Sequence, residues 1–190
     1  MHRLEERPGR PTIVGIRRGT GGGRSLILNG HLDTVGVVGY AGDPFSGELR
    51  DGRVLGRGAF DMKGGVAAIL VAAARATGAS GAGASVLAGS VAGFRFRLTR
   101  LVTRAAFEAD PEWPIVRTLS AHAAAVLGRR PDVRGEPFWT DAGLLHEAGI
   151  PCLVVGVDGG GAHADAEWAD AASVDALTEI LTRTIVDFCA

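Results

Sequence analysis

An apolar stretch without internal proline, residues 63–77, constrains the fold of this 190-residue chain most strongly. Its alanine, leucine, valine and isoleucine residues predict a helix that ends at Gly78. The apolar run of residues 64–74 is shorter than the roughly 18 residues that a membrane-spanning helix needs. We therefore expect a buried helix in a globular fold, and no membrane association.

Short apolar runs bounded by turn signals predict the strands against which this helix packs. Residues 25–29 are typical of a buried central strand, and residues 171–188 repeat apolar side chains at helical spacing. Further strands are expected at residues 12–18, 85–92 and 151–157, and further helices at 114–127 and 141–148, the last capped by Asp141. This alternation predicts an α/β fold, specifically a three-layer αβα sandwich with a mostly parallel mixed sheet.

The segments between these elements are rich in glycine. Residues 33–53 show no periodicity and predict a long loop with a turn at Asp51-Gly52. The first ten residues are polar, and we expect them to be loosely held.

Charge and cysteine content exclude several function classes. The formal net charge is −1, which gives no electrostatic basis for binding nucleic acid. Cys152 and Cys189 form no Cys-x-x-Cys pair, so we expect neither a cysteine metal site nor a disulfide framework. No secretory signal opens the sequence, and a cytoplasmic location is expected.

His31 and Asp33 form a His-x-Asp pair immediately after the strand predicted at residues 25–29. Side chains two positions apart on an extended segment point to the same side. A histidine that binds a metal usually donates its other ring N–H to a carboxylate or carbonyl. The pair therefore fits a metal ligand and its partner, although a polar turn at a strand end has the same spacing.

Asp61 follows Gly56-Arg57-Gly58 and precedes the apolar helix. A carboxylate in this place is typical of a helix cap. It is also the natural bridge between two divalent ions, because its two oxygens suit ions about 3.5–4 Å apart. The residues alone leave both roles open.

His163 follows Gly159-Gly160-Gly161 and precedes Asp165 and Glu167. It is either a metal ligand or a solvated loop histidine. The remaining histidines, His2, His122 and His146, lie near the terminus or on predicted helix surfaces and receive no role.

Four motifs taken in order carry a family resemblance. They are Gly-His-Leu-Asp-Thr-Val at 30–35, Gly-Arg-Gly-Ala-Phe-Asp-Met-Lys-Gly-Gly at 56–65, Thr-Asp-Ala with Gly-Ile-Pro at 140–151, and Gly-Ala-His-x-x-x-Glu-Trp at 161–168. Together the motifs resemble the zinc metallopeptidase family of acetylornithine deacetylase, succinyl-diaminopimelate desuccinylase, aminoacylase and carboxypeptidase G, from about residue 13 to residue 188.

The resemblance implies two zinc or cobalt ions in one cleft. His31 is implied as a ligand of one ion, His163 as a ligand of the other, and Asp61 as the bridge, followed by a cis peptide bond to Met62. Asp33 is implied as the partner of His31. The implied reaction is attack of a metal-bridging water on the amide carbonyl of an N-acyl amino acid or small peptide.

The chain departs from this family after residue 92. Relatives carry a Glu-Glu pair there, which supplies the general base and a metal ligand, whereas this chain has no acidic residue before Glu108. A further acidic metal ligand also has no counterpart, and an opening helix and strand are expected to be missing. We expect weakened metal binding, with Glu167 or Asp165 as the only candidate substitutes for the base.

The same departure shapes the expected domain organisation. Residues 11–92 and 114–190 are expected to form two halves of one catalytic-type domain. Residues 93–113, with Arg95, Arg97, Arg100 and Arg104, are expected to be the remnant of a lid or dimerisation domain, and their apolar face could support a homodimer.

Three functions follow from these observations. The first is a deacetylase-like metal-dependent amide hydrolase with impaired activity. The second is a non-catalytic truncated member of the family, and the third is a metal-binding or ligand-binding domain. Substrate-binding residues are not assigned.

Overall fold

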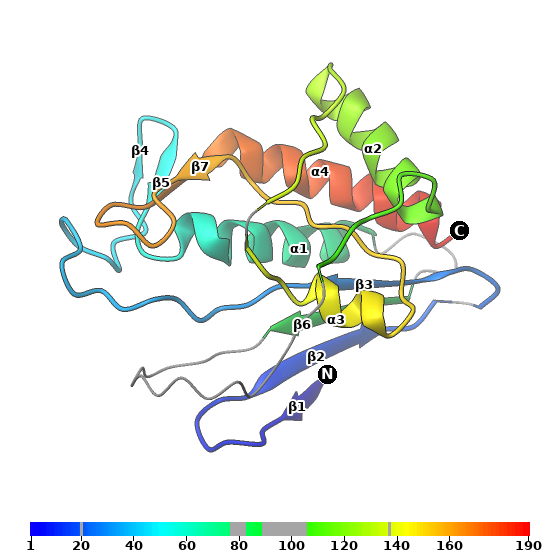
Figure 1. Ribbon diagram of the computed structural model, residues 1–190, viewed down its shortest axis with the longest axis horizontal. Coiled ribbons are helices and arrows are strands. Elements are labelled where there is room, and N and C mark those ends of the chain that lie inside the picture. The colour runs from blue at the N-terminus through cyan, green and yellow to red at the C-terminus, as the bar shows by residue number, and fades with distance from the viewer. Residues whose placement is uncertain (20, 77–82, 89–105, 137) are drawn as a thin grey trace. The chain divides into compact units, whose positions relative to one another are not determined.

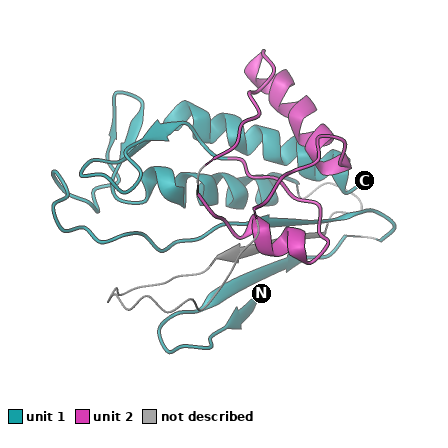
Figure 2. Cartoon of the chain, in the orientation of Figure 1, with its two compact units in different colours: residues 1–92, 156–190 teal, residues 93–155 magenta. Residues whose placement is uncertain are grey.

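The computed structural model describes residues 1–19, 21–76, 83–88, 106–136 and 138–190, with 83–88 described as backbone (Figure 1). Residues 1–92 and 156–190 form one compact unit, and residues 93–155 form a second (Figure 2). The residues of the predicted metal site all belong to the first unit.

The first sheet has the strand order β1-β2-β6-β3. Its strands are β1 (His2–Leu4), β2 (Thr12–Arg17), β6 (Gly83–Ala88) and β3 (Ser25–Asn29). β2 pairs antiparallel with both β1 and β6, whereas β3 and β6 are parallel. Parallel pairing requires a crossover, which the helix between β3 and β6 provides.

Three predictions about this sheet need correction. The sheet is mixed, but only one of its three described pairings is parallel, because the N-terminal strands return directly without a helical crossover. The first ten residues are not all loose, since β1 pairs with β2. Residues 151–157 form no strand in the described structure, and Val154 and Val155 are exposed. Apolar composition suggests a strand, but it does not determine whether a neighbouring strand is in place to pair with it.

The second sheet has the order β4-β5-β8-β7. Its strands are β4 (Leu49–Arg50), β5 (Arg53–Leu55), β8 (Trp168–Asp170) and β7 (Gly159–Gly160), and all pairings are antiparallel. Asp51 and Gly52 form the β4–β5 turn with φ values of 50° and 75°, as a two-residue turn with positive φ at both positions requires. The predicted turn is confirmed, and the predicted long loop ends in a hairpin.

Two helices build the core of the first unit. α1 (Gly64–Arg75) follows the π-helical turn η1 (Ala59–Lys63), and α4 (Ala171–Phe188) ends the chain. The predicted bounds of α4 are confirmed, and α1 begins one residue later than predicted and ends two residues earlier. α1 and α4 lie side by side (Figure 1). The buried apolar residues are Val66, Ala68, Ile69 and Ala72 of α1 and Leu177, Ile180, Leu181 and Ile185 of α4.

The second unit contains α2 (Pro114–Leu127) and α3 (Ala142–Glu147). α2 has the predicted bounds, with proline at its start and Gly128 at φ 66° after it. Asp141 makes no side-chain cap on α3, contrary to the prediction. Thr140 Oγ1 accepts a hydrogen bond from Ala142 N at 3.3 Å instead.

Other expectations concern the chain as a whole. Cys152 and Cys189 are both buried, and Cys152 Sγ donates to the Ala142 carbonyl at 3.4 Å. Among the described residues, none of the helices combines the length and the apolar character that a membrane span requires. The four arginines at 95, 97, 100 and 104, and the segment 93–105 of the predicted lid remnant, lie outside the described residues.

The α1–α4 packing gives a first test. Ile185 is 1% exposed, whereas its neighbour Val186 is 38% exposed. Ile185→Ala should lower the free energy of unfolding by about 2–5 kcal/mol, because it leaves a cavity between the helices. Val186→Ala should change the same quantity by less than about 1 kcal/mol. Urea denaturation measures both, and equal losses would contradict this packing.

Candidate metal centre

His31 lies directly after β3, and Gly30 allows the end of this strand to approach α1 closely. A Cβ atom at position 30 would lie 2.9 Å from Val66 Cγ2 and 3.0 Å from Met62 Cε. Since real side chains do not tolerate such contacts, only glycine fits without a shift of its neighbours. This close approach brings His31 next to Asp61.

Asp61 interrupts the turn that precedes α1. Its φ and ψ values of −116° and 92° are not helical, and the peptide bond to Met62 is cis, as the resemblance implied. The N-cap position of α1 is occupied by Lys63, and no side chain caps it. The helix-cap interpretation of Asp61 is therefore wrong.

The Asp61 carboxylate lies between the two predicted histidine ligands. Its Oδ1 is 3.3 Å from His31 Nε2, and its Oδ2 is 3.0 Å from His163 Nε2. Each carboxylate oxygen therefore faces a different histidine, which is the arrangement expected of a bridging carboxylate. The structure brings together the three residues that the sequence singled out.

When the His31 ring is neutral, its unprotonated nitrogen, Nε2, faces Asp61. Its Nδ1 lies 3.0 Å from the carbonyl oxygen of Asp33 and 3.3 Å from Asp33 Oδ1. Because a carbonyl oxygen can only accept, the first contact places the proton on Nδ1. The lone pair of Nε2 then faces the Asp61 carboxylate, and a positive charge between them would stabilise this arrangement.

A divalent ion fits the spacing between His31 and Asp61, whereas His163 Nε2 and Asp61 Oδ2, 3.0 Å apart, are in direct hydrogen-bond contact. Two ligand atoms about 2.0–2.1 Å from a tetrahedral zinc ion lie about 3.3–3.4 Å apart, close to the observed His31–Asp61 distance of 3.3 Å. Imidazole nitrogen and carboxylate oxygen are also suitable zinc ligands. A proton on His31 Nε2 would also place a positive charge between this nitrogen and the Asp61 carboxylate.

The donor set for each ion is nevertheless short. Among the described residues, no three His, Cys, Asp or Glu side chains converge to hold one ion. Each ion would have one histidine and one Asp61 oxygen, whereas catalytic zinc normally has three protein ligands.

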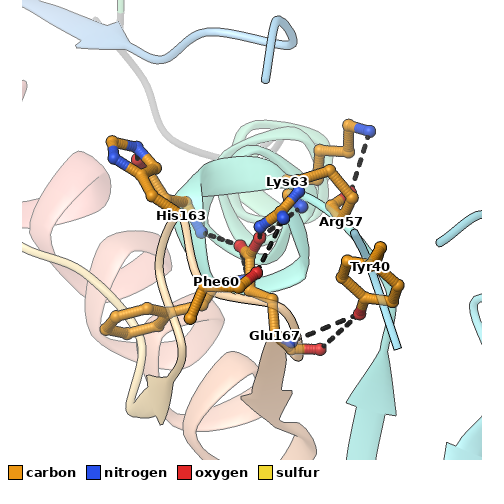
Figure 3. Close-up of polar contacts among 9 residues, drawn as sticks. Tyr40, Arg57, Phe60, Lys63, His163 and Glu167 are labelled. Carbon is orange, nitrogen blue, oxygen red and sulfur yellow. Dashed lines mark hydrogen bonds and ion pairs between the residues drawn. The ribbon is translucent and has the colours of Figure 1, made fainter. Parts of the chain in front are cut away.

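Glu167 holds the backbone around Asp61. It is 2% exposed, and its Oε2 accepts hydrogen bonds of 2.9 Å from Arg57 Nη1 and from Gly58 N. Its Oε1 accepts from Phe60 N at 3.1 Å and from Asp61 N at 2.9 Å (Figure 3). Both oxygens are thus engaged, so Glu167 is not placed to serve as the general base that the sequence left open.

These donors also determine the charge of Glu167. Burial by itself would raise the pKa of the Glu167 carboxyl. The backbone N–H groups of Asp61 and Gly58, the Arg57 guanidinium and the N–H of Phe60 outweigh burial, and the pKa is lowered. Glu167 is therefore a buried anion paired with Arg57, and sequence reasoning missed this role. The acid within the His163 motif and the arginine within Gly-Arg-Gly were its visible signals.

Strand pairing brings Arg57 to Glu167. In the β5–β8 register Leu55 lies opposite Trp168 and Val54 opposite Ala169. Arg57 comes two residues after β5 and Glu167 one residue before β8, so the two side chains meet at the same end of the pair. Gly58, at φ 82°, lets the chain turn there into η1.

His163 lies in an exposed turn, with its own φ at 65° and that of Gly161 at 73°. Arg57 Nη2 donates to the carbonyl of Ala164 at 2.7 Å, which fixes this turn on the same arginine. Asp165 is exposed, and its carbonyl accepts from Ala41 N at 2.6 Å.

Comparison with known proteins identifies the family. Residues 27–92 and 95–187 match Peptidase family M20/M25/M40. The chain belongs to this family. The match includes His31, Asp61, His163 and Glu167, and confirms the resemblance drawn from the motifs.

Individual relatives match a shorter segment. A succinyl-diaminopimelate desuccinylase of Cereibacter sphaeroides is 43% identical over 74 residues, 37% of this chain and 20% of that protein. A desuccinylase of Methylorubrum extorquens is 49% identical over 70 residues, 34% of this chain and 18% of that protein. An N-formyl-4-amino-5-aminomethyl-2-methylpyrimidine deformylase of Bacillus subtilis is 44% identical over 70 residues, which are 34% of this chain and 16% of that protein. The matched segments span about a fifth or less of each relative.

The buried Glu167 predicts acid sensitivity. A pKa below the ordinary value of 4.5 means that the ionised carboxylate stabilises the fold above about pH 4.5, and that this contribution is lost as the pH falls through the lowered pKa. Glu167→Gln should lower the free energy of unfolding at pH 7 by about 3–5 kcal/mol, because it leaves Arg57 buried without an anion. It should also flatten the acid limb of stability against pH.

The matched control is Glu179→Gln, which breaks an exposed pair with Arg183 on α4. It should change the free energy of unfolding by less than about 0.5 kcal/mol. Urea denaturation at pH values from about 3 to about 8 measures the free energy of unfolding of both variants. Equal effects of the two substitutions would contradict the structural role of Glu167.

Proposed function

We propose that this chain is a metal-dependent, deacetylase-like hydrolase of amide bonds in N-acyl amino acids or small peptides, with activity impaired by its missing acidic ligands. The observation that carries the proposal is the Asp61 carboxylate, which has one oxygen on His31 and the other on His163. Family membership supports the same reading of the three residues.

The chain's own residues have distinct parts in this proposal. His31, Asp61 and His163 would hold zinc or cobalt, and Asp33 would orient the His31 ring and raise its basicity as a ligand. When bound, such ions polarise an amide carbonyl and lower the pKa of a bound water. A substrate with a small acyl group is supported by the desuccinylase and deformylase names of the relatives.

A metal-binding or ligand-binding domain without turnover is the second candidate. It is favoured by the Glu167 carboxylate, whose two oxygens are both taken by hydrogen-bond donors. Besides the Asp61 carboxylate, which contacts both histidines, the Asp33 carboxylate contacts His31, at 3.3 Å. A truncated member of the family that hydrolyses nothing would share these features.

The remaining expectations complete the proposal. Residues 11–92 and 114–190 would form the catalytic-type domain, and 93–113 the remnant of a lid. We further propose a cytoplasmic protein that acts on a small substrate, with a homodimer formed through the lid remnant.

Cobalt and zinc titration by calorimetry tests the metal site. We expect binding that is weaker than in a complete two-metal site and that is abolished in His31→Ala. His2→Ala, on the exposed strand β1, is the control and should bind as the unchanged chain does. Two tight sites would contradict the expected weakening.

Turnover distinguishes the candidate functions. Hydrolysis of N-acetylated amino acids in the presence of cobalt, lost in His31→Ala but kept in His2→Ala, is the expected result. Metal binding without turnover would favour the binding domain, and neither binding nor turnover in a folded protein would favour the inactive remnant.

A further inference from the structure

Tyr40 joins two loops that the chain places far apart in sequence. Its hydroxyl donates to the Glu167 carbonyl and accepts from Glu167 N, both at 3.2 Å (Figure 3). The Arg57 guanidinium lies over the Tyr40 ring, 4.9 Å from its centre. We name Tyr40, Arg57 and Glu167 the clamp.

The clamp connects the segments that carry the predicted metal ligands. Tyr40 lies in the loop that continues from His31 and Asp33, and Ala41 N donates to the Asp165 carbonyl at 2.6 Å. Arg57 holds the carbonyl of Ala164, next to His163. The Glu167 carboxylate holds the backbone N–H of Asp61. One cluster therefore contacts the loops of both histidines and the backbone of Asp61.

We propose that the clamp is a positioning device that holds the Asp61 carboxylate and His163 at their observed contact, with Tyr40 as its positioning residue. The clamp touches neither histidine ring, so it acts through the backbone. The metal-binding part of this inference rests on the proposed function, whereas the backbone part does not.

The chemistry of the clamp suits this role. The buried Glu167 carboxylate has a fixed set of charged and backbone donors, and such charge-assisted hydrogen bonds are shorter and stronger than neutral ones. Tyr40 adds two hydrogen bonds to the backbone of the same residue, so the Glu167 main chain cannot shift without breaking them. Groups that orient metal ligands in this way typically change metal affinity about 10–100-fold when removed.

Tyr40→Phe isolates the positioning effect, because it keeps the aromatic ring under Arg57 and removes only the hydroxyl. We expect the amide hydrogen exchange of Phe60 and Asp61 to accelerate about tenfold, although neither amide contacts Tyr40. We also expect cobalt affinity, measured by calorimetry and by the visible absorption of the bound ion, to fall about tenfold or more.

Thr182→Val is the matched control. It also removes one hydroxyl, which donates to the Thr178 carbonyl at 2.7 Å within α4. Exchange at Phe60 and Asp61 and cobalt affinity should both remain as in the unchanged chain.

The outcomes separate the two proposals. Unchanged exchange at Phe60 and Asp61 in Tyr40→Phe would overturn the positioning role, and so would faster exchange with unchanged cobalt affinity, since the clamp would then be structural only. If the unchanged chain binds no cobalt, the proposed function fails, and the exchange measurement alone decides whether the clamp positions Asp61.

Discussion

The buried Glu167 carboxylate is the interaction on which the predicted site depends. It lies between a strand end and the turn before α1, and it has four donors within hydrogen-bonding distance. A carboxylate is costly to bury, and this burial is tolerable only because Arg57 and the backbone N–H groups compensate its charge. The need to satisfy this one anion therefore dictates the backbone path through Gly58, Phe60 and Asp61.

In the candidate metal centre the carboxylate between the two histidines is in place, but each ion would lack further ligands. Asp61 offers one oxygen to each histidine, and Asp33 fixes the proton of His31 on the nitrogen that faces away from Asp61. The acids that would complete each ion's ligands have no counterpart in the described structure. The geometry thus fits the proposed bridging role of Asp61 better than it fits a complete set of ligands for either ion.

Sequence patterns predicted the elements whose signals are local. Helical spacing gave the bounds of α4, and a proline followed later by a glycine gave those of α2. The Asp51-Gly52 turn is likewise set by the conformations that these two residues accept. The candidate metal ligands His31, Asp61 and His163 were singled out by motifs, and the structure brings them together.

What the sequence did not reveal depends on pairing between distant segments. The apolar run at 151–157 lacks a strand partner among the described residues, and β1 pairs with β2 although its composition is polar. Arg57 and Glu167 are each visible in a motif, but their partnership follows from the β5–β8 register. Tyr40 carried no signal at all, because a single tyrosine in a glycine-rich loop has no pattern that could indicate its partner.

The β5–β8 pairing also has a consequence for the order of assembly during synthesis. Arg57 and Glu167 are 110 positions apart, so at roughly 5–20 residues per second the ribosome exposes the arginine several seconds before its partner. During this interval the Gly-Arg-Gly-Ala-Phe-Asp segment has no anion to organise it, and Arg57 has to remain in water. The hydrogen bonds that hold Arg57, Gly58, Phe60 and Asp61 therefore form only after Glu167 has been synthesised.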